Sequence, residues 1–216
     1  MAITLAIFDM DYTLIEGDSE VLWSKFLVRE KLMDSSYMDE ILKTLRGYEK
    51  GQIDIRACQT LIFRPLLEID TGRLLHLREK FMQDFSRYFR PFMLERVAWH
   101  AAQGHELLVV TMTNSFIAAP IVAQFGIPNL IATPVEMQDG KITGAGGAEP
   151  PFNSGKVRLY QKWLADRQLK AAESWAYSDS NFDLPLLESV THPVAVTPDA
   201  ILRAAALERH WDLLDH

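Results

Sequence analysis

The sequence has few of the features that mark secreted, membrane-bound or nucleic-acid-binding proteins. Its single cysteine, Cys58, excludes a disulfide within the chain and fits a reducing compartment. The first residues lack the basic segment of a secretory signal, and no apolar run approaches the roughly 20 residues needed to cross a bilayer. A net charge of -7 argues against nucleic acid as the main partner. We therefore expect a cytoplasmic protein whose partner is neither a nucleic acid nor a membrane.

Four short apolar runs predict the strands of a buried sheet. Each run is followed by polar or acidic residues and then by a helical pattern, an alternation that predicts an α/β fold with a parallel sheet. Ligands of such sheets bind beyond the carboxyl ends of the strands, so we expect the polar clusters at one edge. The runs are residues 5–8, 107–110, 175–177 and 194–196.

The region between the first two runs has no good strand pattern and predicts a helical insertion over residues 16–90. Pro91 is the expected return point to a sheet domain made of residues 1–15 and 91–216. A later stretch, residues 131–144, predicts two strands around an Asp-Gly turn. Apolar residues have helical spacing in four segments of the insertion: residues 21–31, 37–50, 55–63 and 72–89.

The first run ends in two acidic residues two positions apart, Asp9 and Asp11. In extended chain both carboxylates face the same space, where each raises the pKa of the other unless a cation intervenes. A folded chain tolerates such a pair where a metal ion or a lysine is bound. A solvated junction between strand and loop is the alternative.

The second run ends in Thr111-Met112-Thr113-Asn114-Ser115, just before a helical stretch. Thr113, Asn114 or Ser115 is the expected helix N-cap. The free N–H groups of such a helix start suit an anion, and plain capping is the alternative.

A third cluster, Asn153-Ser154-Gly155-Lys156, also begins a helix. We predict that Ser154 caps this helix and that Gly155 allows a close approach of the backbone. Lys156 lies in the first turn, where the helix dipole disfavours a cation. This position is easier to understand if Lys156 faces an acidic site, and a solvated surface lysine is the alternative.

A fourth cluster follows the third run and contains Asp179 and, at the start of a helix, Asp183. Asp183 is the expected N-cap, whereas Asp179 has no capping role. Together with Asp9 and Asp11, Asp179 would give a cluster of oxygen ligands, which suits Mg²⁺ where phosphate completes the coordination. The six histidines show no spacing typical of zinc ligands.

Taken in order, the four clusters resemble the four motifs of the haloacid-dehalogenase-like (HAD) phosphohydrolases. These motifs are Asp-x-Asp-x-Thr after the first strand, a Thr or Ser at a strand end, a Lys at a helix start and a late Asp-(x)3-Asp. The tracts Asp-Met-Asp-Tyr-Thr-Leu-Ile and Tyr-Ser-Asp-Ser-x-x-Asp-Leu-Pro resemble subfamily IB, which includes phosphoserine-phosphatase-like enzymes. The resemblance implies a Rossmann-like parallel sheet core, with residues 16–90 as a helical type 1 cap inserted after the first strand.

The resemblance also implies roles for the residues that match the motifs. Asp9 would be the nucleophile that forms an aspartyl-phosphate, and Asp11 the general acid and then the general base. Mg²⁺ would be bound by Asp9, Asp179 and the main-chain carbonyl of Asp11, with Asp183 orienting these ligands. The residues implied to hold the phosphoryl group are Thr13, Thr111, Met112 and Lys156, and Lys156 would also neutralise charge in catalysis.

The implied activity is that of a phosphoric monoester hydrolase, a phosphatase, acting on a small phosphorylated metabolite. A phosphotransferase that shares the aspartyl-phosphate step and a non-catalytic binding protein on the same scaffold are the alternatives. The sequence leaves open the substrate, whether phosphoserine, histidinol phosphate or another phosphomonoester. It also leaves open the oligomeric state and the extent of cap motion.

Recognition of the leaving alcohol is expected from the insertion. Asp18 stands where phosphoserine phosphatases have a glutamate, and it either binds an amine or hydroxyl of the substrate or caps the helix that follows. Motif two lacks the Ser-Gly-Gly of those enzymes and motif four their Gly-Asp-Gly, which argues against phosphoserine. Further candidates for substrate contact are Asn114, Arg56 and Arg64, and solvated helix charge is the alternative for the two arginines.

Overall fold

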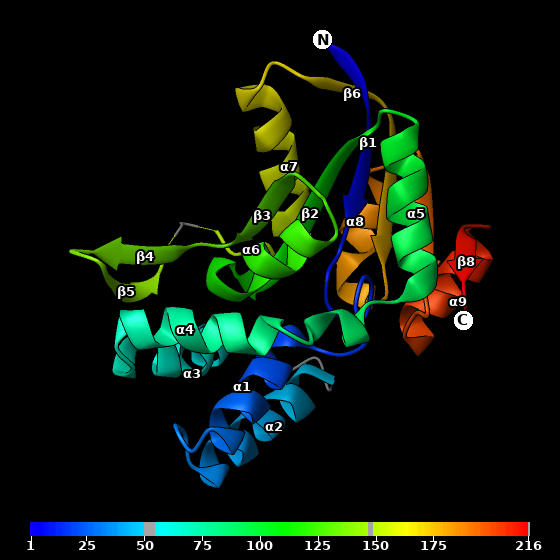
Figure 1. Ribbon diagram of the computed structural model, residues 1–216. Helices are drawn as coiled ribbons and strands as arrows, with labels where there is room; N and C mark the ends of the chain where they lie inside the picture. The colour runs from blue at the N-terminus through cyan, green and yellow to red at the C-terminus, as the bar shows by residue number, and fades with distance from the viewer. Residues whose placement is uncertain (50–54, 147–148, 216) are drawn as a thin grey trace.

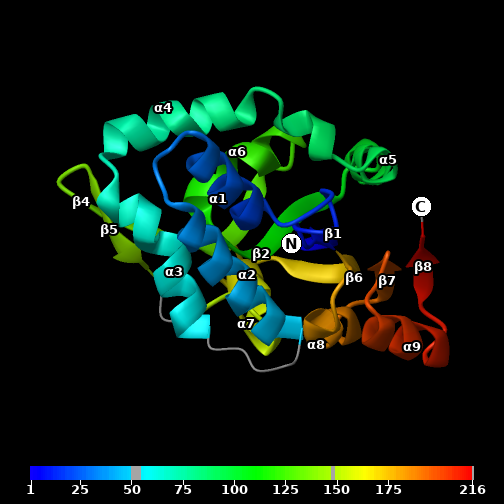
Figure 2. The same ribbon diagram turned by 90° about the horizontal axis from the view of Figure 1, so that it is seen from below.

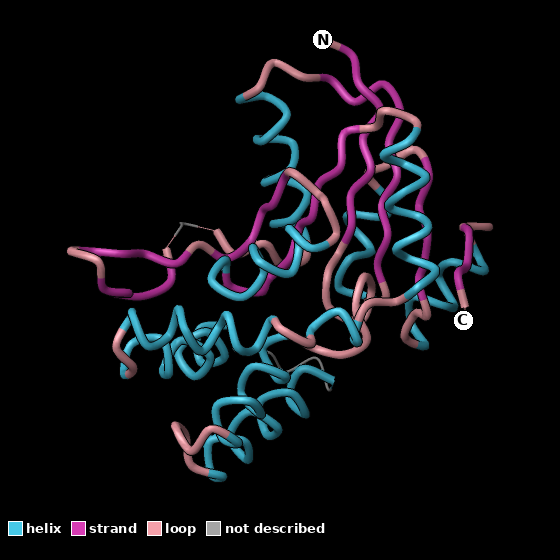
Figure 3. The backbone as a smooth tube through the Cα atoms, in the orientation of Figure 1, coloured by secondary structure: helices cyan, strands magenta, loops and turns pink. Residues whose placement is uncertain are grey.

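The computed structural model describes residues 1–49, 55–146 and 149–215, without the side chains of residues 45–49 and 56. In this part, a sheet with helices on both faces lies above a group of helices (Figure 1). Colouring by secondary structure shows that the lower group contains helices and loops only (Figure 3). Among the described helices, none combines the length and the apolar character that crossing a membrane requires.

Six strands form the main sheet in the order β3-β2-β1-β6-β7-β8, and all neighbouring strands run parallel. The first strand, β1, lies between β2 and β6. The four predicted strands are present, and the predicted α/β fold with a parallel sheet is confirmed. The strands are β1 (Ala2–Phe8), β2 (Glu106–Asn114), β3 (Asn129–Thr133), β6 (Lys170–Ser178), β7 (His192–Val196) and β8 (Asp212–Leu214).

Helices cover both faces of this sheet. They are α5 (Pro91–Ala102), α6 (Ser115–Gln124), α7 (Ser154–Asp166), α8 (Leu184–Glu188) and α9 (Ala200–Glu208). Ala6 and Phe8 of β1 pack in one buried cluster with α5 and α6, whereas Leu5 and Ile7 pack in another with α7, α8 and α9. Alternate residues of a strand point to opposite faces, so burial on both faces explains the continuous apolar run of β1.

In the described residues between β1 and α5, the region predicted to be a helical insertion, the α-helices are α1 (Ser19–Arg29), α2 (Ser35–Glu49), α3 (Ile55–Glu68) and α4 (Thr71–Met82). The predicted end of α3 at Phe63 is too early. The helix continues through Pro65 because the side chains of Phe63 and Leu66 are both buried. The prediction of a single helix over residues 72–89 is also wrong. This segment consists of α4 and a short 3₁₀ helix, Phe85–Tyr88, because Phe89 leaves the helical path to pair with Ile15.

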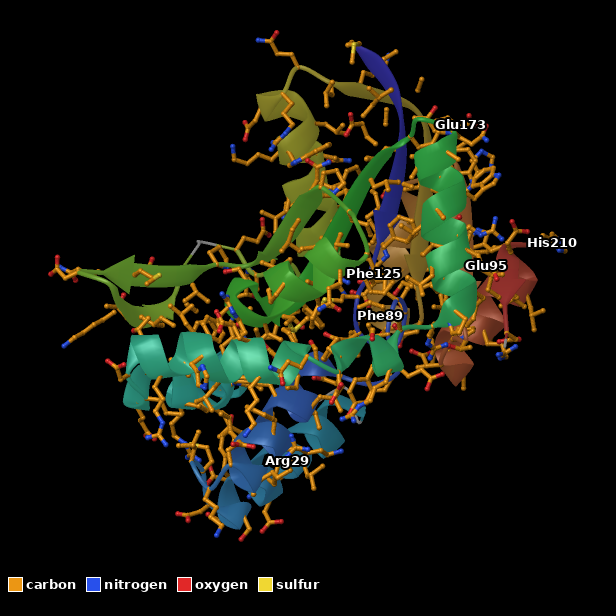
Figure 4. The ribbon with its side chains drawn as sticks, in the orientation of Figure 1. Arg29, Phe89, Glu95, Phe125, Glu173 and His210 are labelled. Atoms are coloured by element: carbon orange, nitrogen blue, oxygen red, sulfur yellow. The ribbon has the colours of Figure 1, made fainter. Side chains whose placement is uncertain are left out.

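The two segments that join the insertion to the sheet run antiparallel to each other. Phe89 and Ile15 form a bridge there. The ring centroids of Phe89 and Phe125, at the end of α6, lie 4.2 Å apart (Figure 4). One buried cluster continues from this face of the sheet into the insertion. The division into a cap of residues 16–90 and a core of residues 1–15 and 91–216 stays a prediction. The main-chain bonds beside the bridge join Glu16 N to Tyr88 O (2.7 Å) and Arg90 N to Leu14 O (3.1 Å).

The predicted pair of strands within residues 131–144 is partly wrong. An antiparallel hairpin is present, formed by β4 (Val135–Gln138) and β5 (Lys141–Ala145) around Asp139 and Gly140. Both turn residues have positive φ, which this tight hairpin turn requires. Residues 131–133, however, belong to β3 of the main sheet, because they pair with β2 rather than with the hairpin.

Candidate active site

The carboxyl ends of β1, β2 and β6 lie next to one another, because these three strands are neighbours in the sheet. A cavity of about 910 Å³ opens there, between the strand ends and the helices of the insertion. Figure 2 looks up at this edge, with α1, α2 and α3 in front of the sheet. The predicted site residues that line the cavity are Asp9, Asp11, Asp18, Arg64, Thr111, Met112, Lys156, Asp179 and Asp183.

Lys156 is buried between two carboxylates. Its Nζ lies 2.8 Å from Oδ1 of Asp9 and 2.7 Å from Oδ2 of Asp183. Burial alone would lower the pKa of Lys156, but the two carboxylates raise it above its usual value. Burial raises the pKa of Asp9 to about 7, although Lys156 opposes this shift. The surface alternative for Lys156 is wrong, since the side chain points into an acidic site.

The start of α7 explains how Lys156 reaches this position. Asn153, not the predicted Ser154, is the N-cap, and its side chain accepts a hydrogen bond from the main-chain N of Ser154 at 2.7 Å. Gly155 lies so close to the preceding loop that an added Cβ would be 2.5 Å from the carbonyl oxygen of Pro150. The close backbone approach predicted at Gly155 is therefore present.

Asp183 occupies the N-cap position of α8, but its side chain makes no capping bond there. The predicted position is therefore present without the capping bond, because Oδ2 of Asp183 accepts from Lys156 and, at 2.7 Å, from the hydroxyl of Ser178. Asp183 thus holds Lys156 beside Asp9.

Within the described residues, the hydrogen bonds to Asp11 come from neutral donors. The hydroxyl of Thr113 donates to Oδ2 at 2.5 Å, and the main-chain N of Ser19 donates to Oδ1 at 2.7 Å. Burial raises the pKa of Asp11 to about 7, and the nearby Asp18 adds to this rise, while the bonds from Thr113 and Ser19 oppose it. The two aspartates of the first motif therefore lie in different electrostatic surroundings.

Asp179 lies across the cavity edge from the first motif and accepts a hydrogen bond from the hydroxyl of Thr13 at 2.9 Å. Burial raises the pKa of Asp179 well above its usual value, and the charge of Asp9 raises it further. Thr13 is fully buried, and its hydroxyl is used by Asp179, so its predicted contact with phosphate stays a prediction.

The oxygen atoms of Asp9 and Asp179 fit a hard cation. Two carboxylates that repel each other, with Lys156 bonded to Asp9 and Asp183, leave negative charge that a divalent ion would balance. Over residues 1–49, 55–146 and 149–215, no group of three or more His, Cys, Asp or Glu side chains is placed to hold a metal. A metal at this edge therefore needs main-chain, water or phosphate oxygens as well, which is how Mg²⁺ is usually bound.

The end of β2 forms the wall beside Asp9. The hydroxyl of Thr111 accepts from the main-chain N of Thr113 at 3.2 Å, and the carbonyl of Met112 accepts from Thr133 at 2.5 Å. Of the three predicted N-caps, Asn114 is the one present, and its side chain accepts from the N of Ile117 at 3.2 Å. These bonds fix the main chain around Thr111 and Met112, the predicted phosphate contacts.

The insertion carries three of the predicted substrate residues, Asp18, Arg56 and Arg64. Asp18 is the N-cap of α1 and accepts from the main-chain N of Val21 at 2.9 Å, so its capping role is present, and it also lines the cavity. Arg64 pairs with Glu40 at 3.0 Å. The side chain of Arg56 lies outside the described residues.

Sequence reasoning missed Glu20, which lines the cavity two residues after Asp18. Its Oε1 accepts from the main-chain N of Asn114 at 2.9 Å and from Nδ2 of Asn114 at 2.7 Å. Asn114, predicted to contact substrate, is 1% exposed and instead holds Glu20. No local pattern indicates this contact, because 94 positions separate the two residues.

Comparison with known proteins agrees with this site. A family model for haloacid dehalogenase-like hydrolases matches residues 6–188. A histidinol-phosphatase of Neisseria meningitidis is 37% identical over 98% of both chains, and a phosphoserine phosphatase of Mycobacterium tuberculosis is 28% identical over 97% of this chain and 70% of its own. The chain belongs to the haloacid dehalogenase-like hydrolase family. The prediction of a phosphatase is confirmed at the level of enzyme class.

Two solved structures share the fold. A protein of unknown function from Bordetella pertussis superposes with a TM-score of 0.91 at 36% identity, covering 100% of this chain and 99% of that one. A substrate-bound phosphoserine phosphatase superposes with a TM-score of 0.73 at 15% identity, covering 99% of this chain and 93% of that one. At 15% identity the second likeness concerns the fold alone.

Proposed function

We propose that this protein is a Mg²⁺-dependent phosphomonoesterase that transfers the phosphoryl group of a small metabolite to Asp9 and then to water. The observation that carries the proposal is the contrast between the two aspartates at the end of β1. Asp9 lies 2.8 Å from the ammonium of Lys156, whereas Asp11 is bound by neutral donors. A carboxylate beside a cation is suited to attack, and a carboxyl without one is suited to carry a proton.

In the first half-reaction, an oxygen of Asp9 forms a bond to phosphorus while the ester bond to the leaving alcohol breaks. Asp11 gives its proton to the alcohol oxygen, and Thr113 and Ser19 hold the carboxylate that remains. In the second half-reaction, Asp11 takes a proton from water as the water oxygen bonds to phosphorus. The bond between Asp9 and phosphorus then breaks and inorganic phosphate is released.

The remaining residues position charge around these steps. Mg²⁺ would be held by the carboxylates of Asp9 and Asp179 and the main-chain carbonyl of Asp11, and when bound it supplies positive charge opposite the phosphoryl oxygens. Asp183 keeps Lys156 in place. The residues we propose around the phosphoryl oxygens are Lys156, Thr111, Met112 and Thr13.

Histidinol phosphate and phosphoserine are the first substrates to test, because the curated relatives named above act on these compounds according to their names. Phosphate release should be measured for both, with a panel of other phosphorylated metabolites and p-nitrophenyl phosphate, in the presence of Mg²⁺. The proposal fails if purified protein releases phosphate from none of them.

Asp9→Asn tests the nucleophile. This variant should fold but lose at least about a thousandfold in kcat, because the neutral amide cannot attack phosphorus. Asp166→Asn is the matched control, since Asp166 is an exposed residue paired with Lys162 on α7. Acid quenching during turnover should trap phosphate on the wild-type chain and on the control but not on Asp9→Asn. Equal labelling of all three would rule out Asp9 as the nucleophile.

A further inference from the structure

Glu20 is fixed in the first turn of α1, at the wall of the cavity. Both of its bonds to Asn114 use Oε1, so the second carboxylate oxygen is free of Asn114. Asn114 is itself held as the N-cap of α6 by its bond from Ile117. Glu20 therefore presents an acceptor in one place, supported by two helices.

The surroundings of Glu20 favour the arrival of a positive group. Burial raises the pKa of Glu20 to about 8, and the charges of Asp18 and Asp11 raise it further, although the bonds from Asn114 oppose the shift. A cation placed beside such a carboxyl stabilises its ionised form and is attracted in return. A negative group there would raise the pKa of Glu20 further and would gain no such attraction.

Two of the cations that line the cavity, among the described residues, are paired with carboxylates other than Glu20. Lys156 is bonded to Asp9 and Asp183, and Arg64 pairs with Glu40. Lys43 is exposed. In the part of the chain that the structure describes, none of the ion pairs involves Glu20 or Asp18.

We infer that Glu20 determines specificity by binding a protonated amine or another N–H donor on the leaving alcohol, and that it disfavours a leaving group with a carboxylate. The inference rests on the proposed function, since it names the substrate class of the same site. Amino alcohol phosphates without a carboxylate, such as histidinol phosphate, fit this wall better than phosphoserine. Glu20 adds to Asp18 a second acidic group directed at the leaving alcohol rather than at phosphate.

A matched pair of substrates isolates the amine. Phosphoethanolamine and 2-hydroxyethyl phosphate differ only by an ammonium in place of a hydroxyl. Wild-type protein should have the higher kcat/KM for phosphoethanolamine. Glu20→Gln keeps an acceptor for Asn114 but loses the charge, and should lower this preference by roughly ten- to a hundredfold, mainly through KM. Both substrates are compared in the same variant, so a general loss of activity does not change the ratio of their kcat/KM values.

Glu30→Gln is the control for the substitution itself, because Glu30 lies at the other end of α1 and pairs with Lys80 at 2.6 Å. It should keep the wild-type ratio. Glu20→Gln should also reduce the preference for histidinol phosphate over phosphoserine. If the ratio of kcat/KM for the matched substrates is unchanged in Glu20→Gln while the wild type still hydrolyses p-nitrophenyl phosphate, the inference about Glu20 is overturned and the proposed function is not. Absence of all hydrolysis by the wild type would instead overturn the proposed function.

Discussion

Arg78 of α4 donates a hydrogen bond from Nη1 to the main-chain carbonyl oxygen of Phe116 in α6, at 3.1 Å. In a regular helix that carbonyl accepts from the N–H of the residue four positions later, which here is Pro120 and has no N–H. The guanidinium carbon also lies 4.5 Å from the centre of the Phe116 ring. A side chain of the insertion thus completes the helix that begins at the active site.

This relationship predicts that the stabilising effect of Arg78 depends on Pro120. Arg78→Met should lower the free energy of unfolding by about 1–2 kcal/mol, because it leaves the Phe116 carbonyl without a donor. In a Pro120→Ala background, residue 120 supplies its own N–H, and the same substitution should have a smaller effect by about 1 kcal/mol. Denaturant unfolding of the four proteins measures this difference. Arg73→Met, an exposed change on the same helix, is the control, and equal effects in both backgrounds would contradict the assignment.

Lys156→Met should lower both activity and stability. Removing the cation leaves Asp9 and Asp183 buried without a partner charge, which typically costs about 3–5 kcal/mol. Adding Asp183→Asn should recover part of the stability but none of the activity, because the charge next to Asp9 is still missing. Thermal unfolding and kcat of the single and double variants test this, with Lys162→Met on the same helix as the surface control. A double variant as unstable as the single one would show that the two carboxylates are not the cause.

Removal of metal should abolish activity. Excess EDTA should stop phosphate release, and Mg²⁺ should restore it, whereas Ca²⁺ should not because it prefers a larger and looser coordination. Mg²⁺ should also raise the melting temperature of the wild type and of Asp166→Asn, but not that of Asp179→Asn. Full activity in EDTA would exclude the metal.

The burial of His100 predicts that the protein loses stability in acid. It is fully buried, with Nδ1 2.8 Å from Nδ1 of His105 and Nε2 2.8 Å from the hydroxyl of Tyr177. Burial lowers the pKa of His100 to about 3, and the neighbouring His105 and Arg96 lower it further. The unfolded chain therefore binds a proton at His100 that the folded chain does not, between about pH 6.5 and pH 3.

The stabilising effect of neutral His100 is thus fully present above that window and is lost as the pH falls through it. Across the window the wild type should lose up to about 1.4 kcal/mol per pH unit more than His100→Gln. Denaturant unfolding at several pH values between 4 and 7.5 measures both slopes. His76→Gln, a change at an exposed histidine, should behave as the wild type does. Parallel slopes for the wild type and His100→Gln would exclude this titration.

The parts of the site nearest to the strand ends were predictable from the sequence. Asp9 and Asp11 follow a continuous apolar run, and parallel strands bring their carboxyl ends to one edge. Lys156 was recognisable because a cation in the first turn of a helix opposes the helix dipole and therefore needs an acidic partner. Each of these signals lies within a few neighbouring residues.

The contacts that local patterns could not predict join distant segments. The bond between Thr113 and Asp11 spans 102 positions, and the Glu20–Asn114 contact spans 94. Strand β8 was missed because it is three residues long and is defined by its pairing with β7 rather than by its composition. The cap of α7 was misplaced by one residue, because the N-cap Asn153 adopts a positive φ that residue type alone does not reveal.

The antiparallel join at the base of the insertion has a consequence for how the chain folds. Strands β1 and β2 are neighbours in the sheet, yet the whole insertion separates them in the chain. Once Ile15 and Phe89 have paired, the loop that must close before β1 meets β2 shrinks from about 97 to about 24 residues, which lowers the entropy cost of closure by about 1 kcal/mol. A substitution that prevents this pairing, such as Ile15→Pro, should therefore slow folding as well as weaken the native state, since early contact at this join brings the two central strands within reach of each other.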